Sequence, residues 1–161
     1  MAVDYFLKIE GVTGESKDAM FPDQLQLLSW SWGQSNTGSA ALGQGRGAGK
    51  VDMQDFSFMI YTGKGSPKLQ QYCATGEHIN EAVLSCRKAG GGTEGGQVFL
   101  TYTFKNLLIS SFQISGSSEN PTESCSFNFE EVKQVYKPQD ETGVTGDNIE
   151  WGYNVKTNTV V

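Results

Sequence analysis

The sequence predicts a mainly β domain, in which two sheets form a barrel-like or sandwich-like body with one short flanking α-helix. Three observations carry this prediction: apolar residues alternate with a period of two, glycine-rich segments separate the predicted strands, and a single segment has helical spacing. The chain has 161 residues, the usual size of one domain. Because no repeat or charge block divides it, we expect residues 1–161 to fold as one unit.

The first two predicted strands show the alternation most clearly. From Val3 to Ile9, every second residue is apolar. Residues 24–33 form the second strand, with Leu28, Trp30 and Trp32 on one face and Ser29, Ser31 and Gly33 on the other. We expect the tryptophans to point inward as core anchors, with an acceptor for each indole N–H, and the serines to point outward. The alternative is an exposed tryptophan pair that binds a sugar or a protein.

A glycine-rich loop is predicted over residues 36–50, where no ordinary strand or helix is expected. Loops of this length are uncommon in compact domains and usually have a function, which favours contact with a partner. The spacing of Gly43, Gly45 and Ala48 matches a loose dinucleotide-binding pattern. No strand precedes it and no helix follows it, so a pyrophosphate would have no helix N-terminus to bind. We therefore predict no nucleotide cofactor.

The remaining elements follow in order. Strands are predicted over residues 51–61, 78–89, 97–106, 107–115, 123–137 and 149–157, with a hairpin loop at 90–96. The one predicted helix covers residues 66–76. Ser66 is expected to be its N-cap and Pro67 its first residue, while Gly76 is expected to be the C-cap.

Composition excludes several classes of function. The net charge is −6 and the lysines and arginines form no run, which argues against nucleic-acid partners and membrane attachment. The three cysteines, Cys73, Cys86 and Cys125, have no C-x-x-C spacing and predict reduced, mostly buried thiols, with neither a disulfide nor a metal site. The N-terminal residues contain no basic start followed by an apolar run, so we expect no signal peptide.

No catalytic constellation is predicted. His78 is the only histidine, no spacing marks a partner for it, and the G-x-S-x-G nucleophile pattern is absent. Two alternatives stay open. A small hydrolase would use His78 and would lose turnover in His78→Ala, whereas a lectin or pilus-like adhesin would explain the aromatic residues and glycines but would normally have a signal peptide.

A series of motifs in chain order resembles one known family. They are Ala2–Ile9 (AVDYFLKI), Gly14–Asp18 (GESKD), Ser29–Gly33 (SWSWG), Gly47–Val51 (GAGKV), the Ser66-Pro67 helix start, Cys73, Gly76 with His78, Arg87–Gly90 (RKAG) and Tyr136–Gln139 (YKPQ). In this order and spacing the sequence resembles the Hcp (haemolysin-coregulated protein) family of bacterial type VI secretion. It departs from many relatives at Met20-Phe21, where they have a histidine.

The resemblance implies a non-catalytic tube protein. Six copies would form a ring, rings would stack into the inner tube of a contractile injection machine, and small effectors would be sheltered in the lumen. The implied partners are the chain itself, a VgrG-type spike, the contractile sheath and secreted effector proteins. The protein would reside in the bacterial cytoplasm before firing and then be secreted.

The resemblance also suggests roles for particular residues. Ser29 and Ser31 would face the lumen and its cargo. Ring-to-ring contact would come from the long loop, through Leu42, Gly43, Gln44, Gly45, Arg46 and Gly47. No cofactor or metal is implied.

Overall fold

The computed structural model describes residues 3–38, 50–88, 96–138 and 146–161, which form eleven strands and one helix. The strands are β1 (Val3–Ile9), β2 (Leu25–Gln26), β3 (Ser29–Ser31), β4 (Gln34–Asn36), β5 (Val51–Met53), β6 (Phe56–Tyr61), β7 (Ile79–Lys88), β8 (Gln97–Ser115), β9 (Thr122–Tyr136), β10 (Ile149–Asn154) and β11 (Thr159–Val160). The helix is α1 (Ser66–Thr75). The prediction of a mainly β fold with one short helix is confirmed for these residues.

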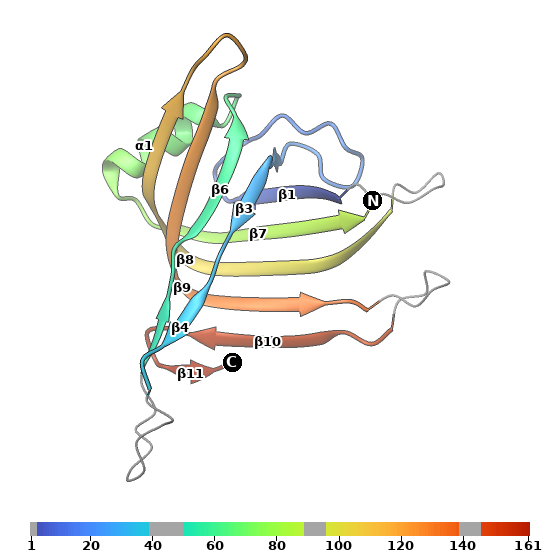
Figure 1. The fold of residues 1–161 in the computed structure, drawn as a ribbon, viewed down its shortest axis with the longest axis vertical. Helices are drawn as coiled ribbons and strands as arrows, with labels where there is room; N and C mark the ends of the chain where they lie inside the picture. The colour runs from blue at the N-terminus through green and yellow to red at the C-terminus, as the bar shows by residue number, and fades with distance from the viewer. Residues whose placement is uncertain (1–2, 39–49, 89–95, 139–145) are drawn as a thin grey trace.

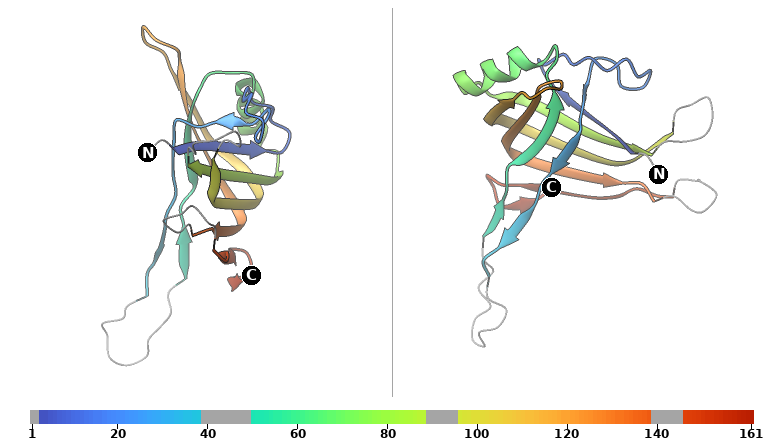
Figure 2. Two further views of the ribbon diagram at one scale, coloured as in Figure 1. Left: turned by 90° about the vertical axis from the view of Figure 1, so that its right-hand side faces the viewer. Right: turned by 45° about the horizontal axis from the view of Figure 1, so that its top comes forward.

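The strands form one nine-stranded antiparallel sheet and a separate two-stranded ribbon of β4 and β5. The large sheet runs in the order β11-β10-β9-β8-β7-β1-β2. β6 pairs with the N-terminal part of β9, which β10 leaves free, and β3 pairs with β6. Figures 1 and 2 show how this sheet folds over into two layers. Its ends do not pair with each other, so the architecture is an open sandwich and not a closed barrel.

The long strands β8 and β9 belong to both layers. Residues 131–136 of β9 pair with β10, whereas residues 122–127 pair with β6. β8 pairs with β9 in both layers. The bend in β8 coincides with a register shift between Ile109 and Ser111 and with a positive φ of 54° at Asn106. The predicted break between strands 97–106 and 107–115 is therefore wrong, because a bulge bends the strand without ending it.

Other predicted strands are divided. Residues 24–33 give β2, which pairs with β1, and β3, which pairs with β6. The chain changes layers between two residues: the Leu27 N–H donates to the Tyr5 carbonyl, and the Leu28 N–H donates to the Met59 carbonyl. Residues 51–61 similarly give β5 in the ribbon and β6 in the large sheet. The predicted hairpin before β8 is confirmed by the pairing of β7 with β8.

The core between the two layers is aromatic. The Phe56 ring lies 5.0 Å from those of Phe104 and Phe127, measured between centroids. Cys86 and Cys125 are buried in this core, where desolvation raises the pKa of each thiol to about 12. All three cysteines are free, and Cys73 is half-buried.

Helix α1 packs against β8 through buried Leu69 and Tyr72. Its C-terminus is as predicted: Gly76 has a φ of 66°, and its N–H donates to the Tyr72 carbonyl at 3.0 Å. The predicted N-cap is wrong, because the N-cap is Gly65 and Ser66 already lies in the first turn. The Ser66 hydroxyl instead accepts a 3.0 Å hydrogen bond from the Gly63 N–H, which fixes the turn that leads into the helix.

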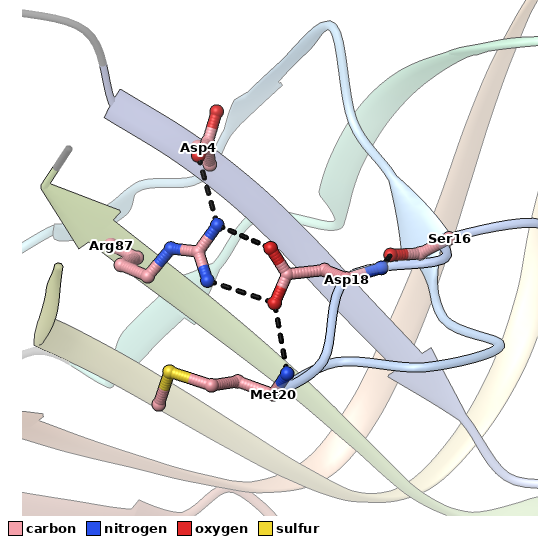
Figure 3. Close-up of polar contacts among 5 residues, drawn as sticks. All are labelled: Asp4, Ser16, Asp18, Met20 and Arg87. Atoms are coloured by element: carbon pink, nitrogen blue, oxygen red, sulfur yellow. Dashed lines mark hydrogen bonds and ion pairs between the residues drawn. The ribbon is translucent and has the colours of Figure 1, made fainter. Parts of the chain in front are cut away.

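One face of β1 and β7 is covered by the connection between β1 and β2 (Figure 3). Arg87 of β7 is only 6% exposed there, and its guanidinium donates to both Asp18 oxygens at 2.9 and 2.6 Å. A third bond of 3.1 Å reaches Asp4, which is the cross-strand neighbour of Arg87 on β1. The Phe6 and Phe21 rings stack at 4.6 Å, and the guanidinium lies 5.2 and 5.5 Å from their centroids. We call these five residues the arginine clamp.

Candidate functional site: the serine face

The layer formed by β3, β6, β9 and the end of β8 carries an uncharged, hydroxyl-rich surface. Its residues form three cross-strand rows: Ser31, Ser57, Ser126 and Ser111; then Ser29, Met59, Ser124 and Gln113; then Tyr61, Thr122 and Ser115. Directly opposed residues of paired strands share one face of a sheet. We call these eleven positions the serine face; seven are serines and none is charged.

The local sequence produces this face by strict alternation. In β3, β6 and β9, the residues between the serine-face positions are Trp30, Phe58, Ile60, Glu123 and Cys125, all buried or half-buried. Small polar residues are thus directed away from the core by the large residues next to them. The described residues leave the serine face uncovered, since most of its members are exposed.

Hydroxyl groups at one end of the serine face are bonded to one another. The Ser126 Oγ lies 2.6 Å from the Ser111 Oγ and 2.8 Å from that of Ser110, because the bulge in β8 places both serines opposite it. Ser110 in turn donates to the Asp55 carboxylate at 2.6 Å. These contacts order the surface. Among the hydrogen bonds of the described residues, no histidine contacts the three hydroxyls, and Asp55 is the one ionisable group that does.

Ser29 and Ser31 both lie exposed on the serine face. The other serines of this face were not predicted as site residues. The Ser-Cys-Ser alternation at 124–126 was a visible signal for part of it. The pairing that brings β9 beside β6 was not visible, because nothing in the spacing of the two segments specifies it.

Trp30 and Trp32 are half-buried and pack against the core. The Trp30 ring stacks on Phe56 at 5.9 Å, and that of Trp32 lies 5.7 Å from Tyr102. The expectation of an acceptor for each indole is wrong for Trp32, whose buried Nε1 has no partner among the described residues. Leu28 was expected on the same buried face but is 43% exposed, because the chain changes layers at Leu27, which is buried instead.

The predicted ring-contact residues, Leu42 to Gly47, lie outside the described residues. The ribbon of β4 and β5 on either side of them is described, and Figure 2 shows it extending away from the body of the molecule. Asn36, which was expected in the loop, is the last residue of β4.

A second exposed surface is apolar and lies at an edge of the large sheet. Ile149 of β10 and Tyr136 of β9 are cross-strand neighbours that are 65% and 40% exposed. Val160 of the edge strand β11 is 74% exposed. Exposed apolar side chains on an edge strand are typical of surfaces that another chain covers.

Clusters of metal-ligating residues and membrane-spanning helices are not found in the described part of the chain. No group of three or more histidine, cysteine or acidic residues there could hold a metal ion. Among the same residues, no helix has the length and hydropathy needed to cross a bilayer. Glu123 is fully buried, yet neither of its carboxylate oxygens has a hydrogen-bond partner among the described groups.

Comparison with known proteins gives consistent matches over the whole chain. Residues 6–136 match the family model described as "Type VI secretion system effector, Hcp". Protein hcp1 of Pseudomonas aeruginosa is 42% identical over 161 residues, which cover 98% of each chain. Among solved structures, Hcp1 from Salmonella typhimurium is 34% identical with a TM-score of 0.80 and full coverage of both chains. A type VI secretion effector from Yersinia pestis is 31% identical with a TM-score of 0.76, covering 94% of this chain and 100% of its own.

Proposed function

Because this chain belongs to the Hcp family of type VI secretion proteins, we propose that it is the structural subunit of the type VI inner tube. Six copies form a ring, and rings stack into a tube that is expelled with a VgrG-type spike when the contractile sheath fires. The subunit has no catalytic role and no nucleic-acid or membrane partner. It is held in the bacterial cytoplasm before firing and is secreted afterwards.

The observation that carries this proposal is the contrast between the uncharged serine face and the exposed apolar edge. A wall that cargo must pass needs to be wettable without holding cargo strongly, and small hydroxyl groups meet both needs. Charged side chains would attract or repel each effector according to its charge. The serine face is therefore proposed to line the lumen, with Ser29 and Ser31 among its cargo-facing residues.

The apolar edge supports self-association. Ile149, Tyr136 and Val160 are exposed in a single chain, and covering them would remove apolar area from water. A ring of identical subunits uses a heterologous interface, in which this edge meets a different surface of the next copy. The ring-contact residues Leu42 to Gly47 are proposed to join one ring to the next.

The first test is the mass of the purified protein by analytical ultracentrifugation, with negative-stain images of the main species. We expect six subunits of 17.5 kDa each in an open ring. A monomer at micromolar concentration would leave the fold intact and remove the basis for the ring. For stacking, oxidised Gly43→Cys protein should join rings covalently, and rings that never join would contradict the proposed role of that loop.

The lumen assignment is tested by effector retention. Ser31→Gln places a longer side chain on the serine face, so we expect co-purification of a secreted effector to be lost while the ring remains. Lys133→Gln, which changes an exposed residue of β9 outside that face, is the matched control and should retain cargo. Retention unchanged in Ser31→Gln would argue that the serine face does not contact cargo.

A further inference from the structure

One buried acidic side chain lies on the inner side of the layer that carries the serine face. Glu123 of β9 stands between Thr122 and Ser124, so the alternation of the strand directs it away from the serine face and into the interior. It is fully buried, and neither carboxylate oxygen has a hydrogen-bond partner among the described residues. Its cross-strand neighbours are apolar, Ile60 of β6 and Ile114 of β8. A buried polar group without partners destabilises the arrangement that buries it.

Helix α1 covers this inner side. It packs against β8 through Leu69 and Tyr72, and Figure 1 shows it beside the upper part of β8 and β9. Cys73 of α1 packs on the core cluster that contains Cys125. Burial, and after it the nearby Glu123 and Cys73 groups, raise the pKa of the Cys125 thiol to about 12. Glu123, Cys125 and the inner side of α1 therefore lie together.

The contact between α1 and the strands is apolar. Only Ser66, Leu69 and Tyr72 of its ten residues are buried. The Ser66 and Thr75 hydroxyls bond to the turn before the helix and to the helix itself. Among the described residues, no hydrogen bond or ion pair joins α1 to a strand. A helix of this length is marginal in water without packing partners, so a small number of apolar contacts holds α1 in place.

The connection between β1 and β2, which covers a different face of the sheet, is held in another way. The arginine clamp fixes it through the hydrogen bonds from Arg87 to Asp18, and a further bond joins Arg87 to Asp4 of β1. α1 has no such bonds among the described residues, and it lies over a carboxylate that has lost its water. Elements with few buried contacts and no polar attachment open with the smallest free energy. We therefore expect α1 to open before the clamped connection does.

We propose that α1 is a strap that opens while the strands stay paired, and that the buried Glu123 promotes this opening. In the closed state the Glu123 carboxylate is dry and has no partner among the described residues. In the open state water solvates it, which favours opening. Opening also exposes Cys125 and the apolar surface beneath Leu69. The subunit therefore has two conformations that differ at α1.

The test is the alkylation rate of the two buried thiols, measured with iodoacetamide and peptide mass spectrometry. Cys125 and Cys86 are both buried, and the pKa of each is raised to about 12, so Cys86 is an internal control. Cys86 lies on β7 with β1 and β8 paired on either side. Cys73→Ser removes the half-buried thiol, whose alkylation would disturb α1. We expect Cys125 to react roughly tenfold faster than Cys86 or more. Equal rates would overturn the proposal, because α1 would then open only when the whole subunit unfolds.

The role of Glu123 is tested by a variant in the same background. Glu123→Met should slow the alkylation of Cys125 by roughly tenfold or more, because the closed state no longer buries an unsatisfied carboxylate. Glu119→Met is the matched control, since it makes the same change at an exposed position of the turn between β8 and β9, and it should leave the rate unchanged. If Cys125 reacts equally fast in both variants, Glu123 does not promote the opening and that part of the proposal is overturned.

Hydrogen–deuterium exchange of the unmodified protein locates the opening. The amides of α1 should exchange faster than those of β9 around Ser124, which is paired with Met59 of β6. If residues 122–126 exchange together with α1, the end of the sheet frays as a whole and the proposal is overturned. Neither measurement requires a ring, an effector or a sheath, so the result does not depend on the proposed function.

Discussion

The arginine clamp and the serine face differ in the charge and the burial of their polar groups. In the arginine clamp, a charged residue is buried beneath the chain's own connection and bonded to two carboxylates. On the serine face, the polar groups are neutral, small and largely exposed. The first arrangement stabilises a single subunit, whereas the second leaves a surface free for other molecules. Internal charges stabilise the fold, and the uncharged hydroxyls are proposed to contact other molecules.

The largest effect on the free energy of unfolding is expected when the arginine clamp is removed. Arg87→Ala removes a guanidinium that bonds to Asp18 and Asp4 and packs on two aromatic rings, and it should lower the free energy of unfolding by about 3 kcal/mol. Urea denaturation would measure it. Lys133→Ala is the control, because Lys133 and Glu150 form an exposed 3.7 Å pair. Lys133→Ala should lower the free energy of unfolding by less than about 1 kcal/mol. Equal losses would contradict the contrast between the two kinds of ion pair.

Glu123 is buried, as Arg87 is, but its carboxylate has no hydrogen-bond partner among the described residues. It therefore allows a buried polar group with partners to be compared with one without them. Glu123→Met replaces it with an apolar side chain of similar length. We expect the free energy of unfolding to rise by about 2 kcal/mol, because an unsatisfied polar group leaves the core. Thermal unfolding of both proteins measures this. A lower melting temperature for Glu123→Met would reveal a polar partner for the carboxylate.

At acidic pH, the pH dependence of stability reports on the clamp. The hydrogen bond from Arg87 is the main cause that lowers the Asp18 pKa from 3.8 to about 2. This contribution to stability is therefore complete above about pH 4 and is lost as the pH falls towards 2. Asp18→Asn should be less stable than the original protein at neutral pH, and the difference should shrink over this window. A difference that stays constant down to pH 2 would refute the assignment.

The smallest effect is expected on the serine face. Ser124→Ala removes one exposed hydroxyl and should change the free energy of unfolding by less than about 0.5 kcal/mol. Chemical denaturation beside Arg87→Ala provides the measurement. A loss comparable to that of the clamp would mean that the serine face stabilises the subunit itself.

Much of the fold could be predicted from local pattern. The alternation in β1 and β3 and the Pro and Gly residues at the ends of α1 are determined within a few residues of sequence. The serine positions of β3 were predicted for the same reason, because Trp30 and Trp32 on the opposite face direct them outward.

Features that depend on distant partners could not be predicted. Leu27 is buried and Leu28 exposed only because one pairs with β1 and the other with β6. Asp18 and Arg87 are 69 residues apart, and no spacing rule relates them. The bulge in β8 also has no local signal, since Ser110 and Ser111 resemble the residues of any exposed strand. The four-stranded extent of the serine face follows from these long-range pairings.

The unbroken course of β8 and β9 through both layers has a mechanical consequence. Two separate sheets in a sandwich can slide or peel apart when only side-chain contacts hold them. Here a load on one layer passes to the other along covalent backbone, and the rows of hydrogen bonds between β8 and β9 share it. The subunit should therefore yield as one piece under tension or compression, as the proposed role in an expelled tube would require.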